Sequence, residues 1–112
     1  MSANRPFALT IAGFDPSGGA GVLADVKTFE QHRVYGLAIN TGNTIQTENE
    51  FYEMQWTDLD FVLRSLETLF GSYSINAVKI GIVPSLKYLK TIVFTIKKLS
   101  PKTKIIWDTV LK

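Results

Sequence analysis

The chain has 112 residues, of which 46% are apolar and 20% charged, and its formal net charge is +2. Both signs of charge are scattered along the sequence, so no basic patch favours binding to nucleic acid or to a membrane surface. Cysteine is absent, which excludes disulfides and thiolate metal sites, and no apolar run approaches the roughly 20 residues of a membrane helix, so we expect one cytoplasmic domain.

The first half of the chain alternates short apolar runs with one helical pattern. Residues 7–12 form an apolar run that predicts a buried strand. Apolar side chains at helical spacing predict a helix over 20–32, and two further strands are expected over 36–40 and 49–56. The glycine-rich segment 13–19 should be the loop that joins the first strand to the helix.

The second half repeats the alternation. Thr57, followed by acidic residues, predicts the start of a helix that ends at Gly71. A β-branched strand is expected over 77–83, then a helix to about residue 99 that is capped by Ser85. The last predicted strand covers 104–107. Strands that alternate with helices predict an α/β fold with a mainly parallel sheet covered on its faces.

Ligands of open α/β sheets bind beyond the carboxyl ends of the strands, where this sequence gathers glycines and polar residues. Four glycines lie within residues 13–21, and the helix after them offers its N-terminal amides to an anion. Two standard nucleotide-binding motifs do not match this segment. A P-loop needs Lys and then Ser or Thr where Gly19 and Ala20 stand, and the dinucleotide-binding pattern G-x-G-x-x-G is absent. A tight strand-to-helix turn would use the same glycines. The predicted phosphate-binding loop comprises Asp15, Ser17, Gly18 and Gly19.

Four further polar residues have two interpretations each. Asp25 falls early in the predicted helix, where an acid can simply complement the helix dipole. The Gln46 amide carries a donor and an acceptor that match an aminopyrimidine edge, although a loop glutamine can also face solvent. Lys79 interrupts an apolar strand, so it either lies at a sheet edge or reaches a partner at the rim. Asp108 comes directly after the last strand, where a carboxylate can hold a metal ion or cap the next element of the fold.

The segment LTIAGFDPSGGAGVLADVKTF at residues 9–29 closely resembles the N-terminal signature of the hydroxymethylpyrimidine kinases, members of the ribokinase-like superfamily. Shorter landmarks of the same family occur in order at 35–36, 44–46, 78–81 and 107–110. The sequence departs from the family pattern at Phe14, where a small Ser or Thr is usual. The resemblance implies a three-layer α/β/α sandwich, of which residues 1–112 would be the N-terminal, substrate-binding half of one domain.

The resemblance also implies a function. The family transfers phosphate from ATP, with Mg²⁺, to 4-amino-5-hydroxymethyl-2-methylpyrimidine and then to its monophosphate in thiamine biosynthesis. Carried over by position, the residues that would line the pyrimidine pocket are Gly13, Ala20, Asp25, Gln46 and Val110. Gln46 would contact the aminopyrimidine edge, Asp25 would face the hydroxymethyl or amino side, and Asp108 would lie near the phosphate and the metal.

Family members are about twice this length, and the remaining half would hold the catalytic base and most ATP contacts. We therefore expect no catalytic residue within the chain and little activity from it alone. Two alternatives remain, a pyridoxal-type vitamin kinase and a half-domain that binds a ligand or partner without catalysis. We also expect a homo-oligomer, for example a dimer, because the last strand would otherwise have an unpaired edge.

Overall fold

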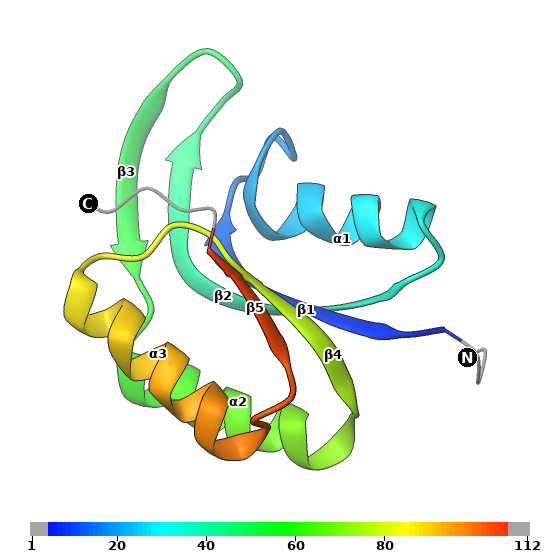
Figure 1. The fold of residues 1–112 in the computed structure, drawn as a ribbon. Helices are drawn as coiled ribbons and strands as arrows, with labels where there is room; N and C mark the ends of the chain where they lie inside the picture. The colour runs from blue at the N-terminus through cyan, green and yellow to red at the C-terminus, as the bar shows by residue number, and fades with distance from the viewer. Residues whose placement is uncertain (1–4, 108–112) are drawn as a thin grey trace.

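The computed structural model describes residues 5–107, which form a single sheet with helices on both faces (Figure 1). In chain order the elements are β1 (Phe7–Phe14), α1 (Gly21–Gln31), β2 (Tyr35–Gln46), β3 (Phe51–Trp56), α2 (Leu59–Ser72), β4 (Ile75–Ile80), α3 (Leu86–Leu99) and β5 (Lys104–Trp107). The predicted order of strands and helices is therefore confirmed. So is the predicted α/β class.

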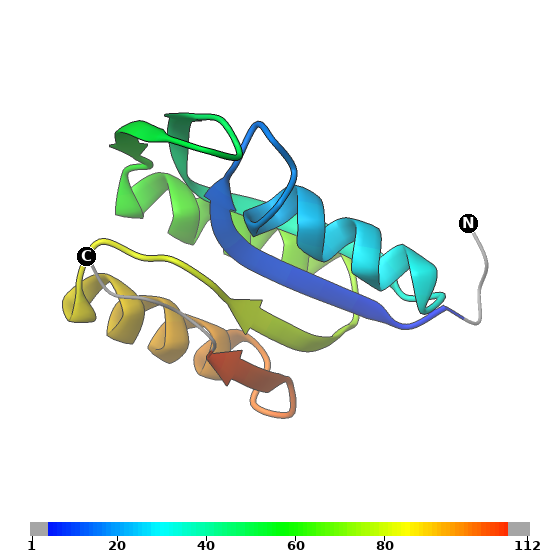
Figure 2. The ribbon, with the colours of Figure 1, turned by 90° about the horizontal axis from the view of Figure 1, so that it is seen from above.

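The five described strands are arranged in the order β3-β2-β1-β4-β5. β1 pairs in parallel with both β2 and β4, and β4 pairs in parallel with β5, whereas β3 runs antiparallel to β2. Helix α1 lies along β1 and β2 on one face, and α2 and α3 pack side by side on the other (Figures 1 and 2). The result is the predicted three-layer arrangement.

The central strand β1 is apolar apart from Thr10, because helices cover both of its faces. Leu9 and Ile11 are fully buried, and they meet the apolar stripes of α2 and α3. Ser85 caps α3 as predicted, because its hydroxyl oxygen accepts a hydrogen bond of 3.1 Å from the backbone N–H of Tyr88. The fully buried aliphatic residues of the core are Leu9, Ile11, Val62, Leu66, Val78, Ile80, Val83, Ile92 and Ile96.

Several element bounds differ from those predicted: β4, for example, covers Ile75–Ile80 instead of 77–83. Strand β2 continues to Gln46 instead of ending at Asn40, because its second half forms an antiparallel ladder with β3. Helix α2 begins at Leu59 and includes Gly71, which was predicted to end it. The longer β2 matters for function, because Gln46 lies at its end instead of in a loop, in the hairpin formed by β2 and β3 (Figure 1).

Candidate functional site

A hollow of about 380 Å³ lies beyond the carboxyl ends of β1 and β4, between the loop after β1 and the β2–β3 hairpin. This is the location that the open α/β rule predicts for a ligand. The hollow is lined by Ala12, Gly13, Phe14, Asp15, Ala20, Gly21, Asp25, Thr44, Gln46, Phe51, Met54, Lys79, Gly81 and Ile82. Strands, a helix terminus and a loop all contribute, so the hollow depends on the tertiary fold.

The wall formed by the loop after β1 begins at a register irregularity. The pairing of β1 with β2 shifts between Ala12 and Phe14, where Gly13 of β1 lies opposite two residues of β2, Thr41 and Gly42. A Cβ on Gly13 would lie 3.1 Å from the Ile82 side chain and would reduce the space between β1 and β4. Gly13 thus leaves backbone, and no side chain, at this part of the lining.

Asp15 stabilises the loop after β1. Its carboxylate accepts hydrogen bonds from the Ser17 hydroxyl at 2.7 Å and from the Ser17 backbone N–H at 2.9 Å. The hydroxyl of Ser17, and then the backbone amides of Ser17, Ala20 and Gly19, hold the pKa of Asp15 below its ordinary value of 3.8, against the opposing effect of burial. The loop therefore places a fixed negative charge at one side of the hollow.

Asp25 lies at the base of the hollow and is held at both oxygens. Thr10 of β1 donates to Oδ2 at 2.6 Å, and Lys79 of β4 donates to Oδ1 at 2.6 Å. The Asp25 side chain is 12% exposed and that of Lys79 is 32% exposed. The interpretation of Asp25 as a first-turn acid is wrong, since α1 has no acidic residue in its first turn. Of the two interpretations of Lys79, the structure supports the second: β4 is not at the sheet edge, and Lys79 reaches a partner, Asp25.

Gln46, at the end of β2, lines the hollow from the β2–β3 hairpin. Its Nε2 donates to Oγ1 of Thr44 at 2.7 Å, and the Thr44 hydroxyl donates to the backbone oxygen of Phe14 at 2.9 Å. This chain of hydrogen bonds orients the amide. Within the described residues, the second N–H of Nε2 and the carbonyl oxygen Oε1 make no hydrogen bond, so they remain available to a ligand.

The structure brings most of the described candidate residues together. Gly13, Asp15, Ala20, Asp25 and Gln46 all line the hollow. Ser17, Gly18 and Gly19 belong to the adjoining loop and do not contribute to the lining. Val110 and Asp108 lie outside the described residues.

Sequence reasoning missed several lining or supporting residues. Phe51 and Met54 come from β3, and no local pattern indicates that this hairpin returns to the rim. Thr10 had a signal, because a hydroxyl inside the apolar run 7–12 needs a hydrogen-bond partner when it is buried. Its register partner on β4 is Lys79, which is also a polar residue within an apolar strand.

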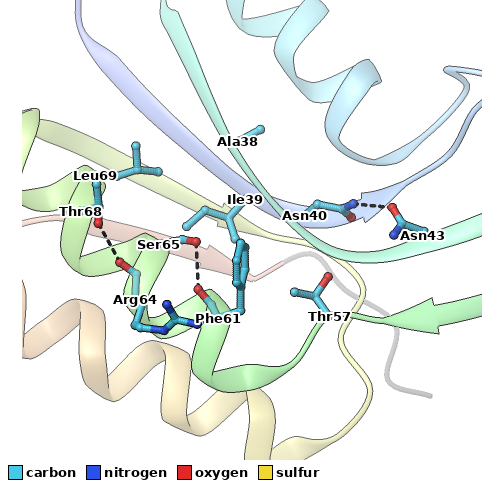
Figure 3. Close-up of a pocket in the computed structure, with 10 residues that line it drawn as sticks. All are labelled: Ala38, Ile39, Asn40, Asn43, Thr57, Phe61, Arg64, Ser65, Thr68 and Leu69. Atoms are coloured by element: carbon cyan, nitrogen blue, oxygen red, sulfur yellow. Dashed lines mark hydrogen bonds between the residues drawn. The ribbon is translucent and has the colours of Figure 1, made fainter.

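A second hollow, of about 610 Å³, lies on the opposite face between β2 and α2 (Figure 3). Although it is larger, several of its polar groups are already engaged locally. Ser65 and Thr68 donate to carbonyl oxygens one turn earlier in α2, and Arg64 pairs with Asp60. The smaller hollow at the strand ends is the better candidate site because its lining holds a carboxylate, an ammonium and an incompletely satisfied amide.

Residues 5–107 contain no group of three or more His, Asp or Glu side chains arranged to hold a metal ion. The described carboxylates of the site, Asp15 and Asp25, are each engaged by protein donors. The described part of the site therefore does not fit a protein-held metal ion. No helix in this part of the chain has the length and apolar character needed to cross a membrane.

Comparison with known proteins identifies the family. The profile of the family described as phosphomethylpyrimidine kinase matches residues 15–112. The hydroxymethylpyrimidine/phosphomethylpyrimidine kinase of Aquifex aeolicus is 39% identical over 99 residues, which cover 88% of this chain and 38% of that protein. The chain thus spans well under half the length of this relative.

Solved structures agree. The crystal structure of phosphomethylpyrimidine kinase from Clostridium difficile superposes with a TM-score of 0.86 at 33% identity, covering 96% of this chain and 50% of that one. A pyridoxal kinase from Staphylococcus aureus in complex with AMP-PCP gives a TM-score of 0.82 at 26% identity, covering 95% of this chain and 38% of that one. The likeness confirms the expected ribokinase-like architecture, and the chain belongs to the phosphomethylpyrimidine kinase family.

Proposed function

We propose that this chain provides the ring-binding site of a kinase that phosphorylates 4-amino-5-hydroxymethyl-2-methylpyrimidine and its monophosphate in thiamine biosynthesis. The observation that carries the proposal is the Gln46 amide, which is oriented by Thr44 and faces the hollow that Asp25 also lines. An aminopyrimidine edge offers an amino donor to Oε1 and a ring nitrogen to the remaining N–H of Nε2.

The shape and polarity of the hollow support the same ligand class. Its volume of about 380 Å³ is at the small end of the range for small-molecule sites, as a single substituted ring requires. Phe51, Met54 and Ile82 supply apolar surface, while the polar side chains come from different elements, Gln46 from β2 and Asp25 from α1. A flat ring can therefore contact apolar walls while its substituents reach Gln46 on one side and Asp25 on the other.

Phosphoryl transfer depends mainly on positioning and on stabilisation of charge. We assign the ATP contacts, Mg²⁺ and the catalytic base to the part of the relatives' kinase domain that residues 1–112 do not cover. In this account residues 1–112 form the substrate-binding part of one domain, and Asp108 and Val110 contribute to the same site. The ligand is a small cytoplasmic metabolite, and the chain forms a homo-oligomer.

Isothermal titration calorimetry with the aminopyrimidine alcohol tests the proposal. We expect the wild-type chain to bind it, and Gln46→Ala to weaken binding by about 1–3 kcal/mol, the cost of leaving a buried polar group of the ligand unpaired. Gln31→Ala, at an exposed position at the end of α1, is the matched control and should bind as the wild type does.

Pyridoxal is the informative competitor, because the structural relatives include pyridoxal kinases. Its ring carries a hydroxymethyl group but lacks the amino group that pairs with Oε1 of Gln46. Tighter binding of pyridoxal than of the aminopyrimidine alcohol would transfer the chain to the pyridoxal-type alternative. Binding of neither compound would contradict both kinase proposals for this chain.

A further inference from the structure

Helix α3 presents to solvent a surface that takes no part in the hollow or in the core. Four lysines and one phenylalanine share this surface, at the intervals of three and four residues that place side chains on one side of a helix. It lies opposite the buried stripe that includes Leu89, Ile92 and Ile96. The surface, which we call the basic surface of α3, comprises the exposed residues Lys87, Lys90, Phe94, Lys97 and Lys98.

The charge of the basic surface has one sign only. Residues 86–99 contain no Asp or Glu, whereas α2, which packs beside α3, carries Asp60 and Glu67 as well as Arg64. Within residues 5–107, none of the four lysines forms an ion pair. Lys87 and Lys90 are one turn apart, so their like charges repel. Both signs of charge are scattered along the chain, but the fold gathers positive charge on this one face.

Phe94 lies at the centre of this charge, with two of the lysines before it and two after it along the helix. Its exposed fraction, 70%, is the largest among the exposed large apolar residues in the described part of the chain. Because the basic surface is opposite the side that faces the sheet, a further helix lying beside α3 would contact its flank and leave Phe94 open. An exposed aromatic residue within a charged rim has the composition of a small protein interface.

A linear acidic segment fits this surface better than a bilayer or a nucleic acid does. The four lysines span roughly 17 Å of one helix, at 1.5 Å per residue. A flat anionic bilayer that touched α3 would also approach the exposed Asp60 and Glu67 of α2, which lies beside it (Figure 1). Single-stranded nucleic acids are held in basic grooves with successive aromatic side chains, whereas this surface is a convex helix with one.

We propose that the basic surface of α3 docks an acidic segment of a partner protein. Carboxylates of the segment pair with Lys87 and Lys90 on one side and with Lys97 and Lys98 on the other, and an apolar side chain between them covers Phe94. The partner's charge removes the repulsion between the lysines, and the removal of Phe94 from water adds to the affinity. The inference is independent of the proposed ring-binding site, which lies beyond the strand ends.

Fluorescence anisotropy with two synthetic peptides tests this docking surface. Both peptides consist of glutamates and one leucine, which is central in the first peptide and terminal in the second. We expect the chain to bind the first more tightly by roughly fivefold, because only there does the leucine meet Phe94 while lysines on both sides are paired. Raising the ionic strength from about 0.1 M to about 1 M shortens the screening length from about 10 Å to about 3 Å, and should weaken both complexes.

Variants of the surface locate the complex. Phe94→Ser should weaken binding of the first peptide by roughly fivefold and remove its advantage over the second. Lys90→Glu should also cost roughly fivefold, because repulsion replaces attraction, and Lys97→Gln should cost less, because it only removes a charge. All three positions are exposed, so circular dichroism should show an intact fold.

Two controls are matched to these variants. Lys27→Glu makes the same change of charge at an exposed position of α1, on the other face of the sheet, and Phe61→Ser removes an exposed phenylalanine from α2. Both should bind the peptides as the wild type does. Calorimetry with the aminopyrimidine alcohol should give the same affinity for the wild type, Phe94→Ser and Lys90→Glu, because the basic surface does not line the hollow.

The outcomes are distinct from those of the proposed function. No binding of either peptide at about 0.1 M ionic strength would contradict the inference, and so would equal losses in Lys27→Glu and Lys90→Glu, which would show a response to net charge alone. Tighter binding to phosphatidylserine vesicles or to polyuridine RNA than to the first peptide would overturn it in favour of a bilayer or a nucleic acid. Absence of alcohol binding by the wild type would contradict the proposed function and leave this inference standing.

Discussion

Gly21 faces the backbone of Gly13 so closely that a Cβ on Gly21 would lie 2.1 Å from the Gly13 carbonyl oxygen. Gly21 also has a φ of +70°, a conformation that side chains rarely adopt. These two facts explain why the loop after β1 can fold back on the strand and form one wall of the hollow.

The first prediction concerns this contact. Gly21→Ala should destabilise the chain by at least roughly 1–3 kcal/mol, through backbone strain and the clash together. Gly71→Ala is the matched control, since a Cβ there meets nothing within 4 Å and the residue lies in α2. That variant should gain about 0.5–1 kcal/mol of stability. Urea unfolding measures both, and equal effects would contradict the role of Gly21 in the loop.

The second prediction concerns acid stability. Because the folded loop lowers the pKa of Asp15, the loop contributes stability above the ordinary value of 3.8 and loses it as the pH falls through the lower, folded-state pKa. Ser17→Ala removes the largest cause of the shift. We expect the variant to be less stable than the wild type at neutral pH, and the two to converge between about pH 5 and pH 2.

The control for Asp15 is Ser74→Ala, an exposed serine outside the loop. Its unfolding free energy should stay parallel to that of the wild type across the same pH range. A constant difference between Ser17→Ala and the wild type at every pH would show that Ser17 does not act through the charge of Asp15.

The third prediction concerns alkaline stability. Burial, and to a lesser extent the nearby Asp58 carboxylate, raises the pKa of Tyr88 to about 12 from an ordinary 10.0. Because the folded state raises the pKa, the contribution of the neutral Tyr88 phenol to the free energy of unfolding is fully present below pH 10. This contribution is lost as the pH rises toward 12. Tyr88→Phe should remove this dependence, and Tyr52→Phe, at an exposed position, should not.

At neutral pH the same substitution removes the hydrogen bond of 2.7 Å from the Tyr88 hydroxyl to the Thr57 carbonyl oxygen. This bond joins α3 to the segment before α2. Its loss should cost about 0.5–1.5 kcal/mol, measured by thermal or chemical unfolding. An unchanged stability at neutral pH would mean that water replaces the hydroxyl at no cost.

The predicted secondary structure was correct for the strongest apolar patterns, and it was wrong for the second half of β2, where a partner strand decides the structure, and for the end of α2 at Gly71. The apolar run of β1 and the stripe of α3 are visible in the sequence, since burial alone produces them. The second half of β2 has no such pattern. It is a strand because β3 returns antiparallel to it, and this pairing depends on residues further along the chain, such as Trp56 opposite Gly42.

The candidate site shows the same division. The glycines of the loop and the amide of Gln46 could be proposed from residue type and position. The partner of Lys79 could not, because Asp25 lies 54 residues away in the sequence and meets it only when α1 packs on the sheet. The separation of residues along the chain does not predict such contacts. They become visible only in the folded sheet, where Thr10 and Lys79 are register partners and both bond to Asp25.

The fourth prediction concerns the edge of the sheet. In the described sheet β5 is a terminal strand, and its residues Ile106 and Trp107 are 57% and 52% exposed. An exposed apolar edge can pair with a second copy, so we expect the isolated chain to self-associate with increasing concentration. Ile106→Lys should shift sedimentation toward the monomer.

Phe94→Lys is the control for the edge, because Phe94 is 70% exposed but lies on α3. It adds the same charge away from the strand and should leave the association unchanged. Equal effects of the two substitutions would indicate general apolar contact instead of strand pairing. A wild-type monomer at all concentrations would contradict the prediction outright.

The most direct test of the central claim is to map the ligand on the chain by NMR. In a titration with the aminopyrimidine alcohol, we predict that the amide resonances of residues 13–21 and of Gln46 shift together. Those of Phe61 and Ser65, which line the other hollow, should stay in place. Shifts confined to the hollow between β2 and α2, or no shifts at all, would contradict a ring-binding site at the strand ends.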